Sequence, residues 1–267
     1  MNGPIAQIAA LVCHANAFLC GKRVSFSLQH STCKFCEYVT FVTLAGKEEI
    51  AFAPTPEAWF SRLKEGRCRR ILLRCANRDA KGISDRMSAG MVGGGRRWLI
   101  EACYDDHVDV WEARWAVGNR EAPESRVWRV TYGLFHTQAR QFPFFPPVLS
   151  NVRQGLLSAL TDAREFATRQ KLEGFVRHFD QAQGCLFSQK PLLSVYHGDL
   201  VPEGFLSLEA TQILAGAQPA WVFGGMGSWN DQSFDGEEQA KYLTISDTLF
   251  DKMNGAIAEA VNVGALR

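Results

Sequence analysis

Hydrophobic and polar residues alternate with a period of two through much of the first half of the chain, between residues 22 and 138. β-branched and aromatic residues fill the apolar positions and turn-forming residues bound each run, which is typical of antiparallel strands. In one run Trp111, Ala113 and Trp115 share a face while the residues between them are charged, as expected of a sheet with one buried face. The pattern predicts six strands, at residues 24–30, 37–44, 69–75, 98–104, 108–117 and 126–135.

Apolar residues three and four positions apart predict helices at the N-terminus and through the second half of the chain. The first helix begins at Pro4 and ends near Gly21, because proline suits the first helical turn and glycine commonly follows a helix end. Another is expected within the strand-rich region at residues 56–65, where the Thr55 side chain can cap the first turn. Later helices are predicted to begin near Val152, after a break near residue 170, at Ser207 and at about residue 236.

The segment 141–148 separates the two patterns, because its three prolines remove hydrogen-bond donors and disfavour helix at the preceding residues. We expect a β-rich lobe with an N-terminal helix at residues 1–145 and an α-helical lobe at residues 146–267, or one domain that integrates both. Strands followed by helices, rather than alternating with them, indicate an α+β fold. The expected architecture is a mainly antiparallel sheet in the N-terminal half, packed with a helical C-terminal half.

Composition narrows the class of protein. The 267 residues are 46% hydrophobic and 21% charged, close to globular averages, which argues against wholesale disorder and a coiled coil. No apolar run is long enough to cross a bilayer, so we expect no membrane partner. The eight cysteines occur in a chain whose start lacks a signal-peptide pattern, which favours reduced thiols and a soluble, cytoplasmic protein.

Charge is unevenly distributed along the chain. Residues 1–150 carry 20 Lys and Arg against 14 Asp and Glu, whereas residues 151–267 carry 9 against 14. The basic excess is concentrated between Arg62 and Arg97, and such a cluster favours an anionic partner. The alternative is that the oppositely charged halves face each other, or that the charges lie on solvated faces.

The first candidate binding segment is the long connection at residues 76–97, which joins two predicted strands. Its glycines let backbone N–H groups approach a ligand, and its guanidinium groups suit phosphate or carboxylate. It matches neither a Walker loop nor a dinucleotide fingerprint, so the alternative is a lid or long turn whose glycines serve only the backbone geometry. The candidate ligand-binding residues are Arg86, Gly93, Gly94, Gly95, Arg96 and Arg97.

The second candidate segment, residues 221–231, places three glycines within four positions and follows them directly with polar residues. Helix termination explains one or two of these glycines, so the rest suggest close approach of a ligand to the backbone. In the alternative interpretation Trp229 anchors the loop to the core, while Asn230 or Asp231 caps the next helix. The candidate ligand-binding residues are Gly225, Gly227, Ser228, Trp229 and Asn230.

Three titratable residues are candidates for acid–base chemistry. His197 and Asp199 are two positions apart in a predicted loop, and Asp231 follows the second glycine-rich segment. Cys33 and Cys36 form a C-x-x-C motif at a predicted turn, with a histidine three residues before it. A zinc ion would need more ligands than this motif supplies, and no second such motif is present, so we assign no metal site. The alternatives are a redox motif and ordinary small cysteines in the core or at a turn.

The leading hypothesis is a protein that binds a small anionic ligand, or an acidic segment of a protein partner, in a pocket bordered by both glycine-rich segments. No cofactor is identified. One alternative is a hydrolase or transferase that uses Asp231, or His197 with Asp199, as acid and base. Another is a nucleic-acid or protein-interaction subunit that uses the basic region at residues 62–97.

Overall fold

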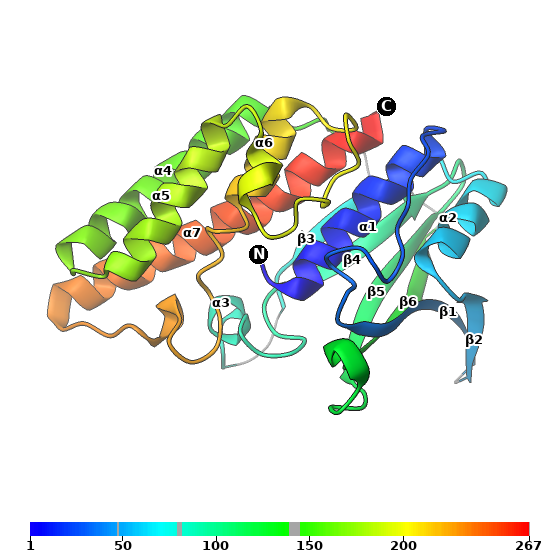
Figure 1. The fold of residues 1–267 in the computed structure, drawn as a ribbon, viewed down its shortest axis with the longest axis horizontal. Helices are drawn as coiled ribbons and strands as arrows, with labels where there is room; N and C mark the ends of the chain where they lie inside the picture. Colours follow the sequence, from blue (N-terminus) through cyan, green and yellow to red (C-terminus); the bar gives the residue numbers. More distant parts are fainter. Residues whose placement is uncertain (47, 79–81, 139–144, 267) are drawn as a thin grey trace.

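A computed structural model describes residues 1–46, 48–78, 82–138 and 145–266. Six strands form one sheet in the spatial order β2-β1-β6-β5-β4-β3 (Figure 1). The strands are β1 (Cys36–Ala45), β2 (Glu48–Ala53), β3 (Arg70–Ala76), β4 (Arg97–Cys103), β5 (Val108–Val117) and β6 (Trp128–Gln138).

The sheet is mixed, so the expectation of a mainly antiparallel sheet is met only in part. Strands β1 and β2 form an antiparallel hairpin, and β3, β4, β5 and β6 form an antiparallel meander. The meander begins at the far edge of the sheet and returns to the hairpin, where β6 lies parallel to β1. Each antiparallel pair joins strands that follow each other in sequence, but the orientation of the β1–β6 pair depends on a contact between residues about ninety positions apart, such as Val39 with Val130.

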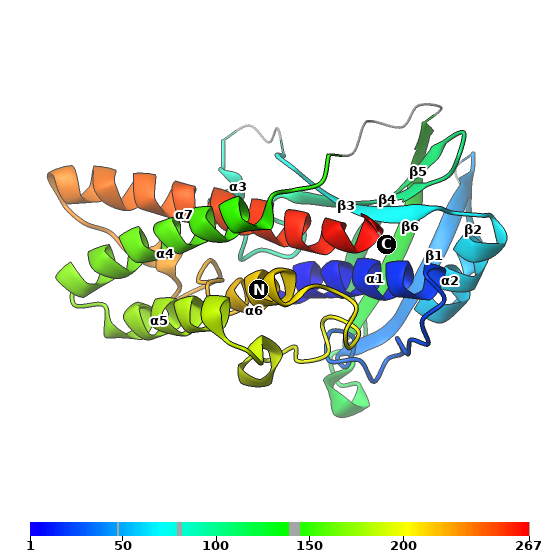
Figure 2. The ribbon, with the colours of Figure 1, turned by 90° about the horizontal axis from the view of Figure 1, so that it is seen from above.

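Helices cover one face of the sheet and continue beyond it. Figure 2 shows α1 and the C-terminal half of α7 side by side against the sheet, while α4, α5 and the other half of α7 extend away from it. One cluster of buried apolar side chains runs from α1 and the sheet into the helices of the second half. The helices are α1 (Gly3–Leu19), α2 (Pro56–Glu65), α3 (Asp85–Ser88), α4 (Leu149–Arg169), α5 (Glu173–Phe187), α6 (Leu208–Gly216) and α7 (Gly236–Asn262).

Local capping signals located the helices well. The Thr55 side chain accepts a hydrogen bond from the Ala58 N–H at 3.2 Å, and Ser207 accepts one from the Ala210 N–H at 3.2 Å. Both helix starts are therefore confirmed, and so is the break at residue 170, which follows the end of α4. In the part of the chain that is described, no helix is both long and apolar enough to cross a membrane.

Two sequence predictions about strands were wrong. Residues 24–26 have no regular structure and residues 27–30 form a turn, closed by the His30 N–H donating to the Ser27 carbonyl oxygen. The side chains of Phe26 and His30 are buried against His14 of α1, which fixes this conformation in place of a strand. Strand β2 was missed, because four of its six residues are exposed and its register comes from backbone pairing with β1. The expected lobe boundary at residues 141–148 lies partly outside the described residues, so the division at residue 145 stays a prediction.

Candidate functional site

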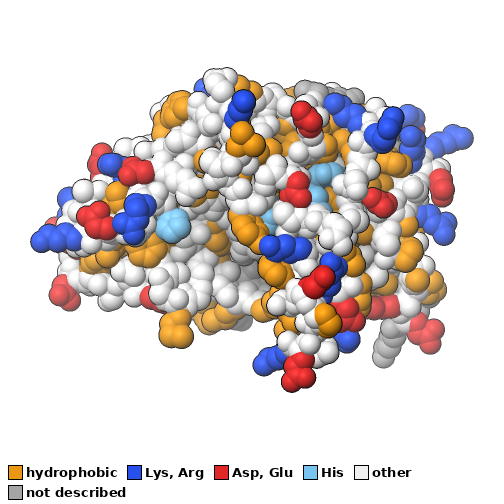
Figure 3. Space-filling view, viewed as in Figure 1, with side chains coloured by type: hydrophobic (Ala, Val, Ile, Leu, Met, Phe, Trp, Pro, Cys, Tyr) orange, Lys and Arg blue, Asp and Glu red, His pale blue; other side chains and the backbone are white. Residues whose placement is uncertain are grey.

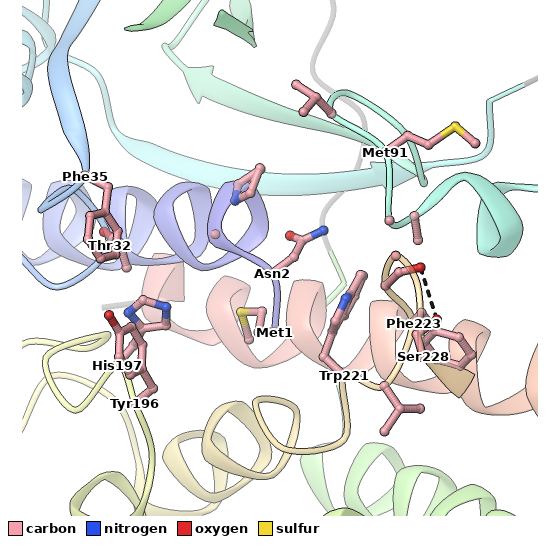
Figure 4. Close-up of a pocket in the computed structure, with 18 of the residues that line it drawn as sticks. Met1, Asn2, Thr32, Phe35, Met91, Tyr196, His197, Trp221, Phe223 and Ser228 are labelled. Atoms are coloured by element: carbon pink, nitrogen blue, oxygen red, sulfur yellow. Dashed lines mark hydrogen bonds between the residues drawn. The ribbon is translucent and has the colours of Figure 1, made fainter. Parts of the chain in front are cut away.

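A cavity of about 700 Å³ opens where the N-terminal end of α1, the sheet and the helical half of the chain meet. Figure 3 shows the surface on this side hollowed between the two halves, with apolar side chains along the hollow. In Figure 4, Trp221 and Phe223 lie on one side of the cavity, and Met91 and Phe35 lie on other sides of it. The aromatic residues that line it are Phe35, Trp115, Trp128, Phe175, Tyr196, Trp221 and Phe223.

The two glycine-rich segments lie against each other and both border this cavity. A Cβ atom added to Gly90 would lie 2.2 Å from the carbonyl oxygen of Gly224, so the two backbones touch. Arg86 donates from Nη1 to Asn230 Oδ1 at 2.9 Å, and Asn230 Nδ2 donates back to the Arg86 carbonyl oxygen at 2.9 Å. These contacts hold together segments that are more than one hundred residues apart in the sequence.

The three arginines expected to bind an anion are each paired with a carboxylate of the protein. Arg86 Nε donates to Asp247 at 2.6 Å, and Arg96 pairs with Asp251, another α7 residue, at 2.5 Å. Arg97 makes two hydrogen bonds to Glu112, at 2.9 and 2.6 Å. None of the described residues that line the cavity is a lysine or an arginine.

The glycines of the first segment serve its own turns. The Gly94 N–H donates to the Met91 carbonyl oxygen at 2.9 Å, and the Gly95 N–H donates to Ser88 Oγ at 3.0 Å. Gly93 and Gly95 have positive φ angles of 72° and 79°, and a Cβ on Gly94 would lie 1.9 Å from the Ser88 carbonyl oxygen. This geometry requires glycine without any ligand.

Some residues of the second segment line the cavity, and others lie in the core. Gly225, Gly227 and Ser228 line the cavity, whereas the Trp229 side chain is fully buried and donates from Nε1 to Ser246 Oγ at 2.7 Å. The Asp231 carboxylate accepts hydrogen bonds from the backbone N–H groups of Gly227 and Ser228, at 2.5 and 3.2 Å. Asp231 therefore caps its own loop, and Trp229 anchors that loop to the helical core.

His197 and Asp199 are joined through Ser31, a residue that the sequence analysis did not single out. His197 Nδ1 lies 2.8 Å from Ser31 Oγ, and Asp199 accepts hydrogen bonds from both the hydroxyl and the backbone N–H of Ser31. A carboxylate can only accept, so the single Ser31 hydroxyl proton points to Asp199. Ser31 Oγ must then accept from His197, which fixes the imidazole proton on Nδ1.

The other imidazole nitrogen of His197 is available to a ligand. Burial lowers the pKa of His197 to about 4, so the ring is neutral over the physiological range. Among the described residues, none forms a hydrogen bond with Nε2, and His197 lines the cavity. Nε2 is thus an unprotonated nitrogen that can accept a hydrogen bond or a proton from a molecule bound there.

The cysteine pair does not acquire the further ligands that zinc requires. Both ring nitrogens of the nearby His30 are engaged, Nδ1 with Thr32 Oγ1 at 2.8 Å and Nε2 with the Asp199 carbonyl oxygen at 2.9 Å. Across the described ranges, no group of three or more histidine, cysteine, aspartate or glutamate side chains could hold a metal ion. The sulfur atoms of Cys33 and Cys36 both accept hydrogen bonds from the side-chain amide of Gln7 in α1.

The site thus combines aromatic walls with one neutral histidine, whose Nδ1 is held by a Ser31–Asp199 relay and whose Nε2 has no hydrogen-bond partner among the described residues. Ser31 had no signal in the sequence, because it lies 166 and 168 positions from the two residues it contacts. Comparison with protein-family models, curated proteins and solved structures finds no match to this chain.

Proposed function

We propose that the protein binds a small, neutral and largely apolar molecule in the cavity. The observation that carries this proposal is a volume of about 700 Å³ with aromatic walls and one neutral histidine. Such dimensions and such a lining, with few convergent polar groups, are those of small-molecule sites. A hydroxyl or N–H group of the ligand would donate to His197 Nε2 and so fix its orientation.

The anionic ligand or acidic partner segment expected from the sequence has weaker support. To bind it, Arg86, Arg96 or Arg97 would have to exchange a carboxylate partner for the ligand and turn toward the cavity. In the basic region proposed for nucleic acid, Arg69 and Arg74 also pair with carboxylates, Asp105 at 2.6 Å and Glu101 at 2.8 Å. These pairs reduce the positive potential that a polyanion would meet.

Filling the cavity should abolish binding of a neutral probe. Gly225 lines the cavity, and an added Cβ there meets nothing within 4 Å, so Gly225→Phe can place a ring in the space without a backbone clash. Titration with the neutral dye N-phenylnaphthylamine, followed by fluorescence, should show affinity reduced about tenfold or more, equivalent to about 1.4 kcal/mol. The matched control is Gly184→Phe, at an exposed helical glycine that also has open space.

Equal affinity in wild type, Gly225→Phe and Gly184→Phe would show that the dye binds elsewhere and would contradict the proposal. The anionic dye anilinonaphthalene sulfonate provides the second comparison. Tighter binding of this dye than of the neutral one, lost in Arg86→Met, would favour the anionic ligand instead.

A second candidate function is acid–base catalysis by His197, as in the hydrolase or transferase alternative. It is favoured by the hydrogen-bond chain from His197 through Ser31 to Asp199. In this chain Nδ1–H is fixed, Nε2 can take a proton from water or a hydroxyl, and the Asp199 carboxylate can stabilise the resulting imidazolium through Ser31. Asp231 lacks such an arrangement, because its carboxylate holds two loop N–H groups.

Hydrolysis of p-nitrophenyl butyrate, an apolar ester, tests this second candidate. His197→Gln should lower the rate by about 100-fold, the usual contribution of a general base. His178→Gln is the matched control, because His178 also lines the cavity but has no such relay among the described residues. The wild-type rate should fall as the pH is lowered toward about 4, the pKa of His197. A rate unchanged in His197→Gln would exclude this role.

A further inference from the structure

Cys33 and Cys36 stand at the two ends of a tight turn beside the cavity. The Cys36 N–H donates to the Cys33 carbonyl oxygen at 2.7 Å, which closes a β-turn over residues 33–36. The first and last Cα atoms of such a turn are less than about 7 Å apart, within the range that a disulfide spans. The turn can therefore accept a bond between the two sulfur atoms with little movement of the backbone.

A buried amide holds the two sulfur atoms together. Gln7 Nε2 donates to Cys36 Sγ at 3.4 Å and to Cys33 Sγ at 3.5 Å. The orientation of this amide is fixed, because Nε2 also faces the Thr32 carbonyl oxygen at 3.3 Å and Oε1 accepts from the Tyr132 hydroxyl at 3.2 Å. A fully buried glutamine whose donors face two thiols stabilises negative charge on sulfur.

The two thiols differ in acidity and in access. The hydrogen bond between them lowers the pKa of Cys36 and raises that of Cys33. Cys36 lines the cavity and is 2% exposed, next to Phe35 and paired with Trp128 of β6, whereas Cys33 is fully buried. By contrast, burial raises the pKa of Cys13 and of Cys68 to about 12, which makes those thiols poor nucleophiles.

We infer that Cys33 and Cys36 form a redox-active dithiol that exchanges with small, apolar disulfides entering the cavity. The Cys36 thiolate attacks one sulfur of the disulfide, forms a mixed disulfide and expels the first thiolate. That thiolate takes the proton of Cys33, and the Cys33 sulfur then attacks Cys36 and expels the second thiolate. The protein loses two electrons to become a Cys33–Cys36 disulfide, and the small disulfide gains them to become one thiol and one thiolate. The thiolate takes from solvent the proton that Cys36 released on ionising.

This inference goes beyond the proposed binding function and does not depend on it. Binding of a neutral probe is non-covalent and needs no cysteine, whereas the exchange leaves a covalent product on identified residues. The aromatic walls define the substrate class, because an aromatic disulfide can stack on Phe35 and Trp128 as its sulfur approaches Cys36. The protein can therefore fail the probe-binding test and still show disulfide exchange, or the reverse.

Dithiodipyridine, an aromatic disulfide, is the probe. The more accessible thiols Cys20 and Cys75 are first replaced by serine, which leaves only buried cysteines. We expect rapid release of two thiopyridone molecules per chain. Trypsin cleaves after Lys34, so digestion without reductant separates the peptides that carry Cys33 and Cys36 unless a disulfide joins them. In mass spectrometry the two peptides should stay linked and should separate on reduction.

Single substitutions distinguish the roles of the two thiols. In the same background Cys33→Ser should release one thiopyridone and retain a mixed disulfide on Cys36, while Cys36→Ser should lose the rapid phase. Gln7→Leu should slow that phase by about tenfold, because the thiolate loses its donor. Cys185→Ser is the control and should behave as the background protein does.

Three results would overturn the inference. The first is rapid thiopyridone release that persists in Cys36→Ser. The second is that the peptides carrying Cys33 and Cys36 separate after complete oxidation. The third is that mass spectrometry finds a disulfide between Cys68 and Cys103 instead. The peptide result needs no substitution at either thiol, so it stands even if a cysteine variant fails to fold.

Discussion

Replacing Gly90 with alanine is expected to destabilise the protein by about 2 kcal/mol and to weaken binding of a neutral probe in the cavity. The added Cβ would lie 2.2 Å from the Gly224 carbonyl oxygen, 2.3 Å from its carbon and 2.7 Å from the Gly225 nitrogen. All three atoms belong to the backbone, so no side-chain rotation relieves the overlap. The two glycine-rich segments must separate, which widens one wall of the cavity and strains the Arg86–Asn230 hydrogen bonds.

Urea unfolding and titration with N-phenylnaphthylamine measure the two effects. Gly225→Ala is the matched control, because Gly225 lies in the same contact region but has open space around an added Cβ. This control should change the free energy of unfolding by less than about 0.5 kcal/mol. If Gly90→Ala kept both the stability and the probe affinity of the wild type, close contact between the two segments would not be needed for either.

Sequence reasoning succeeded where the cause of a structure is local. Pro56 and the Thr55 side chain locate the start of α2, and Ser207 locates the start of α6, because each acts within one helical turn. Strand β5 was predicted with its observed limits, since Trp111, Ala113 and Trp115 alternate with charged residues in the sequence. The same reasoning failed at Phe26, whose environment is set by α1 and α2 and not by its neighbours in the sequence.

The same contrast between local and long-range causes applies to the residues of the candidate site. Both glycine-rich segments were found, because glycine clusters are visible in a sequence, and both border the cavity. The partners of their arginines were not visible, since Arg86 and Arg96 reach Asp247 and Asp251 across 161 and 155 positions. Those pairings connect the first segment to α7. The aromatic lining likewise comes from separate elements that only the fold brings together.

A second large effect is expected on acidification, through three neighbouring histidines buried in neutral form. His14, His30 and His197 are each no more than 7% exposed, and the rings of His14 and His30 are in edge contact at 5.0 Å. Burial lowers the pKa of His14 and of His197 to about 4, and it also lowers that of His30. In the unfolded chain histidine has its ordinary pKa of about 6.5. Between about pH 6.5 and pH 4 the unfolded chain therefore binds protons that the folded protein does not bind.

The free energy of unfolding should consequently fall as the pH is lowered from about 6.5 to about 4, and then level off for these groups. Each histidine with a folded pKa of about 4 accounts for about 2 kcal/mol of loss between pH 7 and pH 5. Asp199 affects the free energy of unfolding at lower pH than the histidines do, because its pKa is below the ordinary value. Its contribution to stability is lost as the pH falls through that lowered pKa.

Urea unfolding at the two pH values measures this loss, and His14→Leu isolates one contribution. The variant removes a proton-binding group that would have to charge in the core, so its loss on acidification should be smaller than that of the wild type by about 2 kcal/mol. His178→Gln is the control, since His178 is exposed and should leave the loss unchanged. An equal loss in wild type and His14→Leu would mean that burial does not lower the pKa of His14 in the folded protein. Stability that rose on acidification would contradict a lowered pKa for the three histidines taken together.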